Sequence, residues 1–559
     1  MHRPTYLSKS SLPQGGVLRA HRPVVKSRKG MVACAHYAAS MAGAQMFFKG
    51  GNAVDAVIAA AAALNVVEPY MSGLGGVGFL VISRNYGEYR EVLNFSGVVP
   101  QKAVPAAFTP GSHSVGVRCP IVPGNPAGWL AVLQAYGTLQ GSDVLGPAID
   151  LAEDGYVVSE LDGRFFEVNF EKLSKFDSSR RAFGKGERPV SESEILVQKN
   201  LASTFRSLAS QGVGGFYTGE VATEIDRFMR ASDGLITESD LESYHPKWQE
   251  PIASTYKGYE IVTTGPNSNA FQILQTLNIL EESGVDGLEH NSAEYIHLVS
   301  EAIKLAVTDR IIYGGDPDFV DVPVTGLISK DYALSQKKRI DRNSASVVMG
   351  ERFTSDPSSG SLQAGSPTGF KSGETTHLSA ADGQGTVVTI TQTLGSAFGS
   401  GVVAGSTGVL LNNLIDLMDI DPKSDSRLLL APGKRPGSNM APVQVFKDGK
   451  FVLSIGTPGS YGIPQTTAQM LLNVLEFGMN VQEAIEAPRF RVMGGVRINM
   501  EDRISTKVRE SLESRGHDVN TLGEWTTEVG GGHAIALDPD TGVLMGGADP
   551  RRDGYALGV

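Results

Sequence analysis

The sequence predicts a mixed α/β fold, and two kinds of hydrophobic periodicity support this prediction. Strand-like alternation occurs in two neighbouring runs, 375–381 and 386–393, which the turn sequence at 382–385 joins into a predicted β-hairpin. Helical spacing of apolar residues occurs elsewhere, for example over 54–64 and 270–282. Periodicity alone predicts both kinds of element but leaves the order of the layers open.

The first half of the chain is predicted to begin with a polar, Pro-containing arm over 1–29. The following segment, 30–108, alternates glycine turns with an Ala-rich helix and a strand at 78–83. Helical spacing then dominates 126–230. The clearest predicted helices of this half cover 54–64, 126–136, 143–152 and 201–210.

The second half contains a predicted strand at 256–264, and strands dominate again after residue 375. Between them, 353–374 is rich in Ser, Gly and Pro and shows little periodicity, as a flexible connection or a plain surface loop would. The predicted helices of this half cover 270–282, 293–308, 464–477 and 481–485.

Composition excludes several classes of function. The chain has 559 residues, 41% of them hydrophobic and 19% charged, as in ordinary globular proteins. Its net charge of -11 argues against nucleic-acid binding, because phosphates require a positive surface. Cys34 and Cys119 belong to no CxxC or Cys/His cluster, so we expect no disulfide, no metal site and no cofactor.

No targeting or membrane segment is expected either. The first 30 residues hold scattered Arg, Lys and His, with no apolar run before a cleavage site of the A-x-A type. The most apolar early stretch, 53–67, contains Asp55 and is too short to span a bilayer, so a buried helix is predicted there. A cytoplasmic protein without a membrane partner is the simplest expectation.

The junction Gly373-Glu374-Thr375-Thr376-His377 opens the predicted hairpin and allows two interpretations of Thr375. A threonine that begins a buried strand is ordinary in an intact chain. If the Glu374–Thr375 bond is cut, however, Thr375 carries a hydroxyl nucleophile and a free α-amine that can serve as its base. The local pattern by itself favours the structural interpretation.

A series of further blocks changes this balance. They are GMVA (30–33), GGNAVDA (50–56), GLGGVGF (73–79), DR (309–310), GDPDF (315–319), LGSAFGSGVV (394–403), GVLLNN (408–413), GKRPGSNMAP (433–442), GTPGS (456–460), APRF (487–490) and ADPR (548–551). In order and spacing they resemble the γ-glutamyltranspeptidase family over about residues 30–555. The resemblance implies a four-layer αββα sandwich of the N-terminal-nucleophile hydrolase type, and it favours a catalytic Thr375.

The resemblance also implies self-processing. Cleavage between Glu374 and Thr375 would leave a large subunit over 30–374, preceded by the arm, and a small subunit over 375–559. The two subunits are expected to remain together, since they would share one intertwined globular unit.

Four residues are expected to carry the chemistry. Thr375 would attack an amide carbonyl, and Thr393 matches the family threonine whose hydroxyl bonds the nucleophile, although a plain strand residue is the alternative. Gly459 and Ser460 occupy the position of the family's Gly-Gly pair, whose backbone N–H groups bind the oxyanion. His377, on the same strand face as Thr375, is expected to be structural.

Substrate-binding positions depart from the family pattern. Ser438 and Asn439 align with paired serines that hold the substrate carboxylate, and the asparagine is still a donor. Ser96 stands where the family has the arginine that clamps the α-carboxylate of glutamate. A glutamate carboxylate would therefore lack its main counter-ion here.

The positions that hold the α-ammonium group also differ. Gly395, Leu414 and Leu417 replace the amide and acidic side chains of the family. Asp416 is adjacent, but on a strand a slip of one residue would turn it away from the substrate. We therefore expect weak recognition of γ-glutamyl compounds.

Three interpretations of function remain. The first is a cofactor-free, self-processed amidohydrolase or acyltransferase that acts on a small-molecule amide with a different acyl group, as divergent relatives such as cephalosporin or glutaryl acylases do. The second is a true γ-glutamyltransferase or glutathione hydrolase. The third is a catalytically idle binding protein of the same fold, against which the joint retention of Thr375, Thr393 and the Gly459 loop argues.

Overall fold

The computed structural model describes residues 20–109, 111–347 and 373–559. Most of the predicted N-terminal arm and nearly all of the Ser/Gly/Pro-rich segment lie outside these residues. Every helix in the described ranges is too short or too polar to cross a lipid bilayer.

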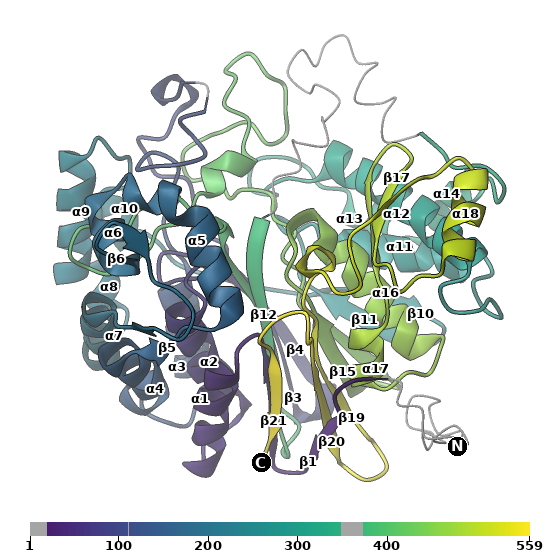
Figure 1. Cartoon of the computed structure of the whole chain (residues 1–559), viewed down its shortest axis with the longest axis horizontal. Coiled ribbons are helices and arrows are strands. Elements are labelled where there is room, and N and C mark those ends of the chain that lie inside the picture. The colour runs from purple at the N-terminus through teal and green to yellow at the C-terminus, as the bar shows by residue number, and fades with distance from the viewer. Residues whose placement is uncertain (1–19, 110, 348–372) are drawn as a thin grey trace.

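Two antiparallel seven-stranded sheets form the centre of the molecule (Figure 1). The first has the order β21 (Tyr555–Gly558), β2 (Gly30–Cys34), β12 (Gly373–Asp382), β13 (Val387–Ser396), β3 (Val77–Arg84), β4 (Tyr89–Phe95) and β9 (Lys247–Gln249). The second has the order β1 (Val25–Ser27), β20 (Leu544–Ala548), β19 (His533–Leu537), β15 (Lys450–Gly456), β14 (Val443–Lys447), β11 (Tyr259–Thr263) and β10 (Ile252–Tyr256). The three smaller sheets pair β5 (Tyr156–Val157) with β8 (Ile195–Leu196), β6 (Gly184–Lys185) with β7 (Arg188–Pro189), and β17 (Arg497–Met500) with β16 (Phe490–Gly494) and β18 (Asp518–Thr521).

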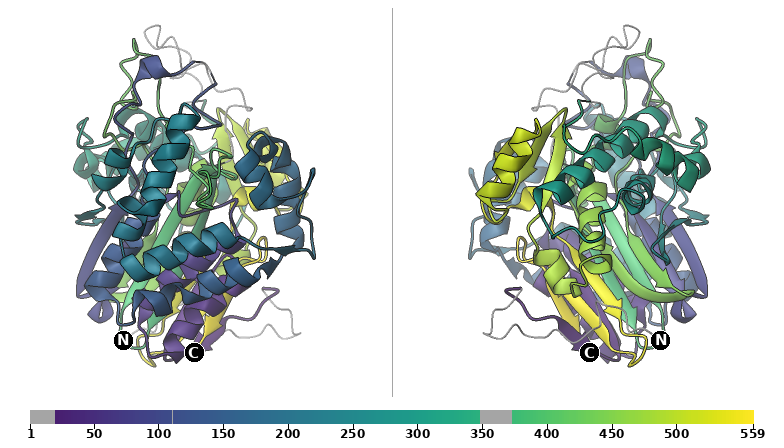
Figure 2. Two further views of the ribbon diagram at one scale, coloured as in Figure 1. Left: turned by 90° about the vertical axis from the view of Figure 1, so that its left-hand side faces the viewer. Right: turned by 90° about the vertical axis from the view of Figure 1, so that its right-hand side faces the viewer.

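Helices cover both outer faces of this pair of sheets (Figures 1 and 2). One layer contains α1 (Tyr37–Phe48), α2 (Ala53–Val67), α3 (Asn125–Tyr136), α4 (Gly141–Asp154), α5 (Glu160–Ser174), α6 (Asp177–Phe183), α7 (Lys199–Gln211), α8 (Gly214–Tyr217), α9 (Glu220–Ala231) and α10 (Glu238–Glu242). The other contains α11 (Phe271–Glu281), α12 (Ala293–Tyr313), α13 (Val324–Leu327), α14 (Lys330–Lys337), α16 (Ile463–Leu475), α17 (Val481–Glu486) and α18 (Thr506–Ser514).

Separate hydrophobic cores join these layers. One lies between the first sheet and α1–α9, and a second between the second sheet and α11, α12 and α16. A third core fills the space between the two sheets, where Val81 and Ala381 of the first sheet meet Val262 and Phe446 of the second. The arrangement is a four-layer αββα sandwich, as predicted.

Local signals explain the best-predicted elements. Helix α2 begins at a capping box, in which the Asn52 side chain accepts from the backbone of Asp55 and the Asp55 side chain accepts from that of Asn52. All fifteen residues of this helix are buried, which confirms the predicted buried helix over 53–67. The strand predicted at 256–264 is shorter than expected: Tyr259–Thr263 forms β11, while Lys257 and Gly258 adopt positive φ and form the turn between β10 and β11.

The hairpin of β12 and β13 lies near the centre of the first sheet. Its turn is fixed by Asp382, whose Oδ1 accepts from the backbone N–H groups of Gln384 (3.0 Å) and Thr386 (2.9 Å). β12 pairs on its other side with β2, so strands from before and after the predicted cleavage site alternate within one sheet. The pairing register of β12 with β13 shifts between Glu374 and Thr375, at the predicted scissile bond.

Candidate active site

A pocket of about 280 Å³ lies at the start of this hairpin. Its walls come from four separate stretches of chain, together with the two hairpin strands. The lining residues are His113, Thr375, Thr393, Gly395, Ser396, Asn413, Leu414, Asp416, Leu417, Ser438, Asn439, Met440, Ser460, Tyr461 and Ile463. Six of the predicted site residues are therefore brought together, although Gly459 and Ser96 do not line the pocket.

Thr375 and Thr393 face each other across β12 and β13. The Thr375 hydroxyl donates to Thr393 Oγ1 over 3.3 Å. The Thr393 hydroxyl donates in turn to the carbonyl oxygen of Glu374 and accepts from the Gly395 N–H at 2.8 Å. A hydroxyl offers one donor and two acceptor sites, so the hydrogen-bonding capacity of Thr393 is fully used. The Thr393 hydroxyl proton is therefore directed at the oxygen of the Glu374 carbonyl, the group that Thr375 would attack.

The loop after β15 carries the two backbone amides of Gly459 and Ser460, and Ser460 lines the pocket together with the threonine pair. Gly459 has φ of 132°, which favours glycine, and Ser460 has φ of 55°, which is unusual for a residue with a Cβ. Thr457 connects this loop to the segment around Gly531, because its Oγ1 accepts from the Gly531 N–H at 2.9 Å. Within the described chain, neither the Gly459 nor the Ser460 N–H donates a hydrogen bond. Both remain available to a substrate oxygen.

His377 does not line the pocket. It is fully buried, its Nδ1 lies 2.9 Å from Thr391 Oγ1, and burial holds its pKa well below the usual range. Its ring packs so closely on Gly456 that a Cβ there would lie 2.3 Å from His377 Cε1. The histidine therefore joins β12 to β15 as a neutral side chain.

Ser438 and Asn439 line another part of the pocket wall. Asn439 Oδ1 accepts from Asn269 Nδ2 at 3.1 Å and from Arg310 Nη1 at 3.4 Å. A guanidinium can only donate, so this contact sets the amide orientation and leaves the Asn439 NH₂ group for other acceptors. Arg310 also packs on the pocket residue Tyr461, and burial lowers the pKa of the arginine to about 10. Arg310 belongs to the DR block at 309–310, and no role in the site was predicted for it.

Ser96, predicted to bind substrate, lies instead behind the pocket wall. Its side chain is buried and donates to Asn267 Oδ1 over 3.2 Å. Asn267 Nδ2 in turn donates to the Pro436 carbonyl at 2.6 Å, and its backbone carbonyl accepts from the Ser438 N–H at 3.0 Å. Through Asn267, Ser96 therefore supports the loop that carries Ser438, and its own side chain does not line the pocket.

The prediction for Asp416 was wrong. Residues Leu414–Leu417 form a 3₁₀ helix and not a strand, so the alternation of sides that was expected to turn Asp416 away does not apply. Asp416 lines the pocket together with Leu414 and Leu417. Its carboxylate accepts from the Ser114 hydroxyl and lies 3.8 Å from His113 Nε2. His113 is a pocket residue that no sequence pattern indicated, since it lies on a loop about 260 residues before Thr375.

Charged groups contact the residues on each side of Thr375, next to the predicted scissile bond. The Glu374 carboxylate pairs with Arg552 Nη2 at 3.4 Å. Burial raises the pKa of Glu374, and the Arg552 charge offsets part of this effect. The next residue, Thr376, donates to Glu68 Oε2 at 3.2 Å, and burial raises the pKa of Glu68 to about 8.

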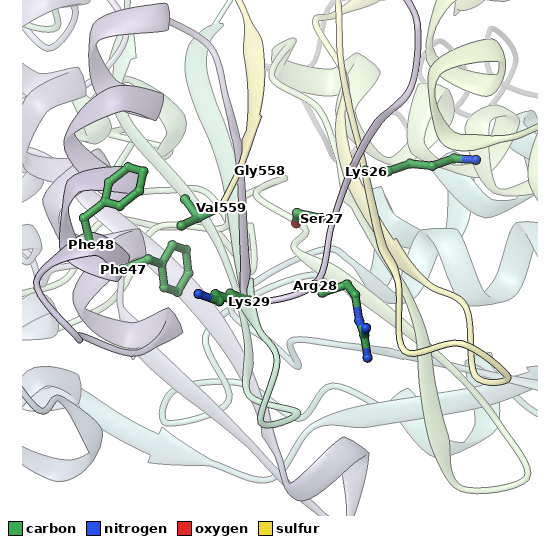
Figure 3. Close-up of a pocket in the computed structure, with 8 residues that line it drawn as sticks. All are labelled: Lys26, Ser27, Arg28, Lys29, Phe47, Phe48, Gly558 and Val559. Atoms are coloured by element: carbon green, nitrogen blue, oxygen red, sulfur yellow. The ribbon is translucent and has the colours of Figure 1, made fainter.

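A second cavity, of about 560 Å³, opens elsewhere on the surface (Figure 3). Phe47, Phe48 and Val559 lie at one end, with Lys29 beside them, and Lys26 points away at the other end. It shares no residue with the pocket around Thr375.

In the part of the chain that the structure describes, two groups have the residue types of metal sites, and one of them contains His36, Asp162 and the partly buried Asp553. In the other, His297 Nδ1 lies 2.8 Å from His517 Nε2, and Glu301 is paired with Lys304 at 2.7 Å. The lysine already supplies the positive charge there. Neither group includes a residue of the pocket around Thr375.

Comparisons with known proteins agree with each other. A family model described as Gamma-glutamyltranspeptidase matches residues 39–559. The acylase ACY 1 proenzyme of Pseudomonas sp. (strain SE83) is 35% identical over 552 residues, which cover 96% of this chain and 95% of that protein. The glutathione hydrolase proenzyme of Bacillus subtilis (strain 168) is 34% identical over 551 residues, with coverages of 96% and 93%.

Solved structures give the same result. Cephalosporin acylase from Bacillus halodurans is similar with a TM-score of 0.88 at 30% identity, covering 98% of this chain and 99% of that one. Helicobacter pylori gamma-glutamyltranspeptidase is similar with a TM-score of 0.55 at 36% identity, covering 59% of this chain and 96% of that one. The predicted fold class is thereby confirmed.

Proposed function

Because the chain belongs to the γ-glutamyltranspeptidase family, we propose that it is a self-processing N-terminal-threonine amidohydrolase whose acyl substrate is not γ-glutamyl. Its place among hydrolases and acylases follows from the family, and the relatives named above are proenzymes. We assign Thr375 as the nucleophile and assign the acyl preference from the residues that line the pocket.

Maturation would begin with attack of Thr375 Oγ on the Glu374 carbonyl carbon. The carbonyl C–N bond breaks, the Thr375 nitrogen takes the proton, and an ester joins Glu374 to Thr375 Oγ. This acyl shift frees the α-amine of Thr375. Water then hydrolyses the ester, which restores the Thr375 hydroxyl and leaves a carboxylate at the end of Glu374. The hydrogen bond from Thr393 to the Glu374 carbonyl supports this step, since it polarises the bond that is attacked.

Turnover would repeat this chemistry on a substrate amide. The Thr375 α-amine takes the hydroxyl proton and returns it to the leaving amine, so that an acyl-enzyme forms and water releases the acid. The Gly459 and Ser460 N–H groups are the proposed oxyanion donors. Removal of one such donor elsewhere costs about 2.7–4 kcal/mol.

The pocket lining carries the assignment of the acyl group. Among the described residues that line it, no arginine or lysine is present, while Leu414 and Leu417 are. A γ-glutamyl donor differs from its glutaryl counterpart only by the α-ammonium group, and much of the wall that would face this cation is apolar. An acyl group without the α-ammonium suits these walls better.

A γ-glutamyl substrate is the second candidate, and the position of Asp416 favours it. A carboxylate in the pocket wall could hold an α-ammonium group, with Ser114 and His113 as its present neighbours. This candidate therefore depends on one acidic side chain, and replacing that side chain tests it.

The deciding experiment compares kcat/KM for a γ-glutamyl anilide with that for its des-amino glutaryl counterpart. The wild type is expected to favour the glutaryl compound, and Asp416→Asn should change the ratio little. A clear preference for the γ-glutamyl compound that Asp416→Asn abolishes would establish the second candidate. A protein that stays a single band on a denaturing gel and hydrolyses neither anilide would instead be an idle binding protein.

A further inference from the structure

Two buried arginines lie near Glu374, and one of them, Arg552, forms an ion pair with its side chain. Arg552 Nη2 lies 3.4 Å from Glu374 Oε2, and the two side chains are 2% and 13% exposed. Arg491 is also buried and lies close enough for its charge to act on the same carboxylate. Its Nη1 donates to the Glu528 carbonyl at 2.8 Å. The Nε atoms of both arginines are buried and have no acceptor in the described parts of the chain.

Cleavage would change the charges that surround Arg552 and Arg491. Glu374 becomes the last residue of the large subunit and loses its bond to Thr375, so its side chain can leave. Arg552 would then have lost the carboxylate with which it pairs in the precursor. Buried guanidinium groups without a counter-ion are unfavourable, so the vacated space would attract an anion. This space opens beside Thr375, since the two residues were neighbours in the chain.

Chemistry shows which anion fits. The ester formed during maturation and the acyl-enzyme formed during turnover are both esters of Thr375 Oγ. In the first, three carbon atoms of Glu374 separate the esterified carbonyl from the side-chain carboxylate. The protein's own first acyl group is therefore a five-carbon dicarboxylic unit, which matches glutaryl apart from the peptide attached at Cα.

We propose that Arg552 and Arg491 form a carboxylate subsite that Glu374 occupies in the precursor and the distal carboxylate of a glutaryl-type acyl group occupies in the mature enzyme. This inference rests on the proposed function, because it assumes that Thr375 is acylated. It adds a site outside the lining of the present pocket, which contains neither arginine. It also gives the residue before the cleavage site a second role, as an internal occupant of the substrate site.

The kinetic test compares glutaryl and pentanoyl p-nitroanilides, which have acyl chains of equal length with and without the carboxylate. Arg552→Gln and Arg491→Gln should each lower kcat/KM for the glutaryl compound by about tenfold or more, as expected for lost charged hydrogen bonds, and change that for the pentanoyl compound less than about threefold. Arg552→Lys should recover part of the loss. Arg90→Gln, which removes an arginine paired with Glu260, is the control and should leave the ratio unchanged.

The binding test needs no turnover. Calorimetry should show that processed wild type binds glutarate more tightly than pentanoate, and that the uncleaved Thr375→Ala protein binds neither, because Glu374 still fills the subsite. If glutarate binds precursor and processed protein equally, the subsite assignment is wrong. It is also wrong if both arginine variants lose the two anilide activities in parallel, or if the glutaryl preference depends on Ser438 instead. Absence of all anilide turnover would refute the proposed function, and glutarate binding would still decide the subsite.

Discussion

At the residue scale, the hydroxyl of Thr393 connects the proposed nucleophile to the bond it would cleave. It accepts from Thr375 and from the Gly395 N–H and donates to the Glu374 carbonyl. Two of these contacts, those with Thr375 and with the Glu374 carbonyl, involve the groups that would react in maturation. Removing the hydroxyl would leave the carbonyl without a donor and the nucleophile without its partner.

Thr393→Val should therefore slow both self-cleavage and turnover while leaving the fold intact, because valine keeps the shape of the side chain. Loss of one oxyanion-type donor predicts a decrease of roughly 10²–10³-fold. The appearance of the two subunits on a denaturing gel and kcat of the processed fraction measure the effect. Thr389→Val, on the same strand, is the matched control. Unchanged rates in Thr393→Val would mean that Thr393 is only a strand residue.

The assignment of Thr375 predicts a specific cut. Intact-mass analysis of wild type should show fragments 1–374 and 375–559, and Thr375→Ala should remain one chain because no hydroxyl is left to attack Glu374. Thr376→Ala tests the neighbouring threonine, which contacts Glu68 and not the scissile carbonyl, and should still be cleaved. Cleavage of Thr375→Ala at the same bond would contradict the assignment.

Glu68 predicts a pH dependence of stability. Burial raises its pKa from 4.5 to about 8, so between these values the folded protein keeps a proton that the unfolded chain has lost. Stability from this group is therefore present below pH 4.5 and is lost as the pH rises towards 8. Glu68→Gln should remove this loss, so that the wild type becomes less stable relative to the variant from pH 5 to pH 8. Parallel urea-denaturation midpoints across that range would contradict the prediction.

At the element scale, the contact between Gly456 and His377 fixes the approach of β15 to β12. Gly456→Ala would place a methyl group inside the histidine ring, and overpacking of this kind costs typically about 1–3 kcal/mol. We expect lower stability and slower maturation, since β15 leads into the Gly459 loop. Adding His377→Ala should recover part of the lost stability, because it vacates the space that the methyl group needs. Additive effects of the two substitutions would show that this contact does not set the spacing.

At the scale of the whole molecule, both sheets combine strands from the two sides of the proposed cleavage site. In the first sheet, β12 and β13 lie between β2 and β3, and in the second, β14 pairs with β11. Separation of the subunits would break these ladders and expose the core between the sheets. The proposed cut lies near one end of the hairpin, and the pairing of β12 with β2 begins beyond it at Ser379.

The cleaved protein should therefore elute as a single species of about the full-length mass in size-exclusion chromatography, although denaturing gels show two bands. It should also unfold in one cooperative transition, because neither subunit contains a complete sheet or core. Elution of either subunit alone without denaturant, or two separate transitions, would contradict the intertwined arrangement.

Sequence by itself determined the features that depend on near neighbours. The hairpin and its threonine junction follow from alternation and a turn within about twenty residues, and α2 follows from an apolar run that starts at a capping box. The ordered family blocks extended these local signals to the αββα fold and to most residues around Thr375.

Tertiary structure alone decided which distant side chains meet the site. Arg552 contacts Glu374 across 178 residues of chain, and His113 reaches the pocket on a loop without regular periodicity. The change from a strand to a 3₁₀ helix at Asp416 and the burial of Ser96 could not be inferred locally either. The path of the chain sets these contacts, because packing between layers determines which loops converge, and that packing leaves no pattern in the sequence of any one loop.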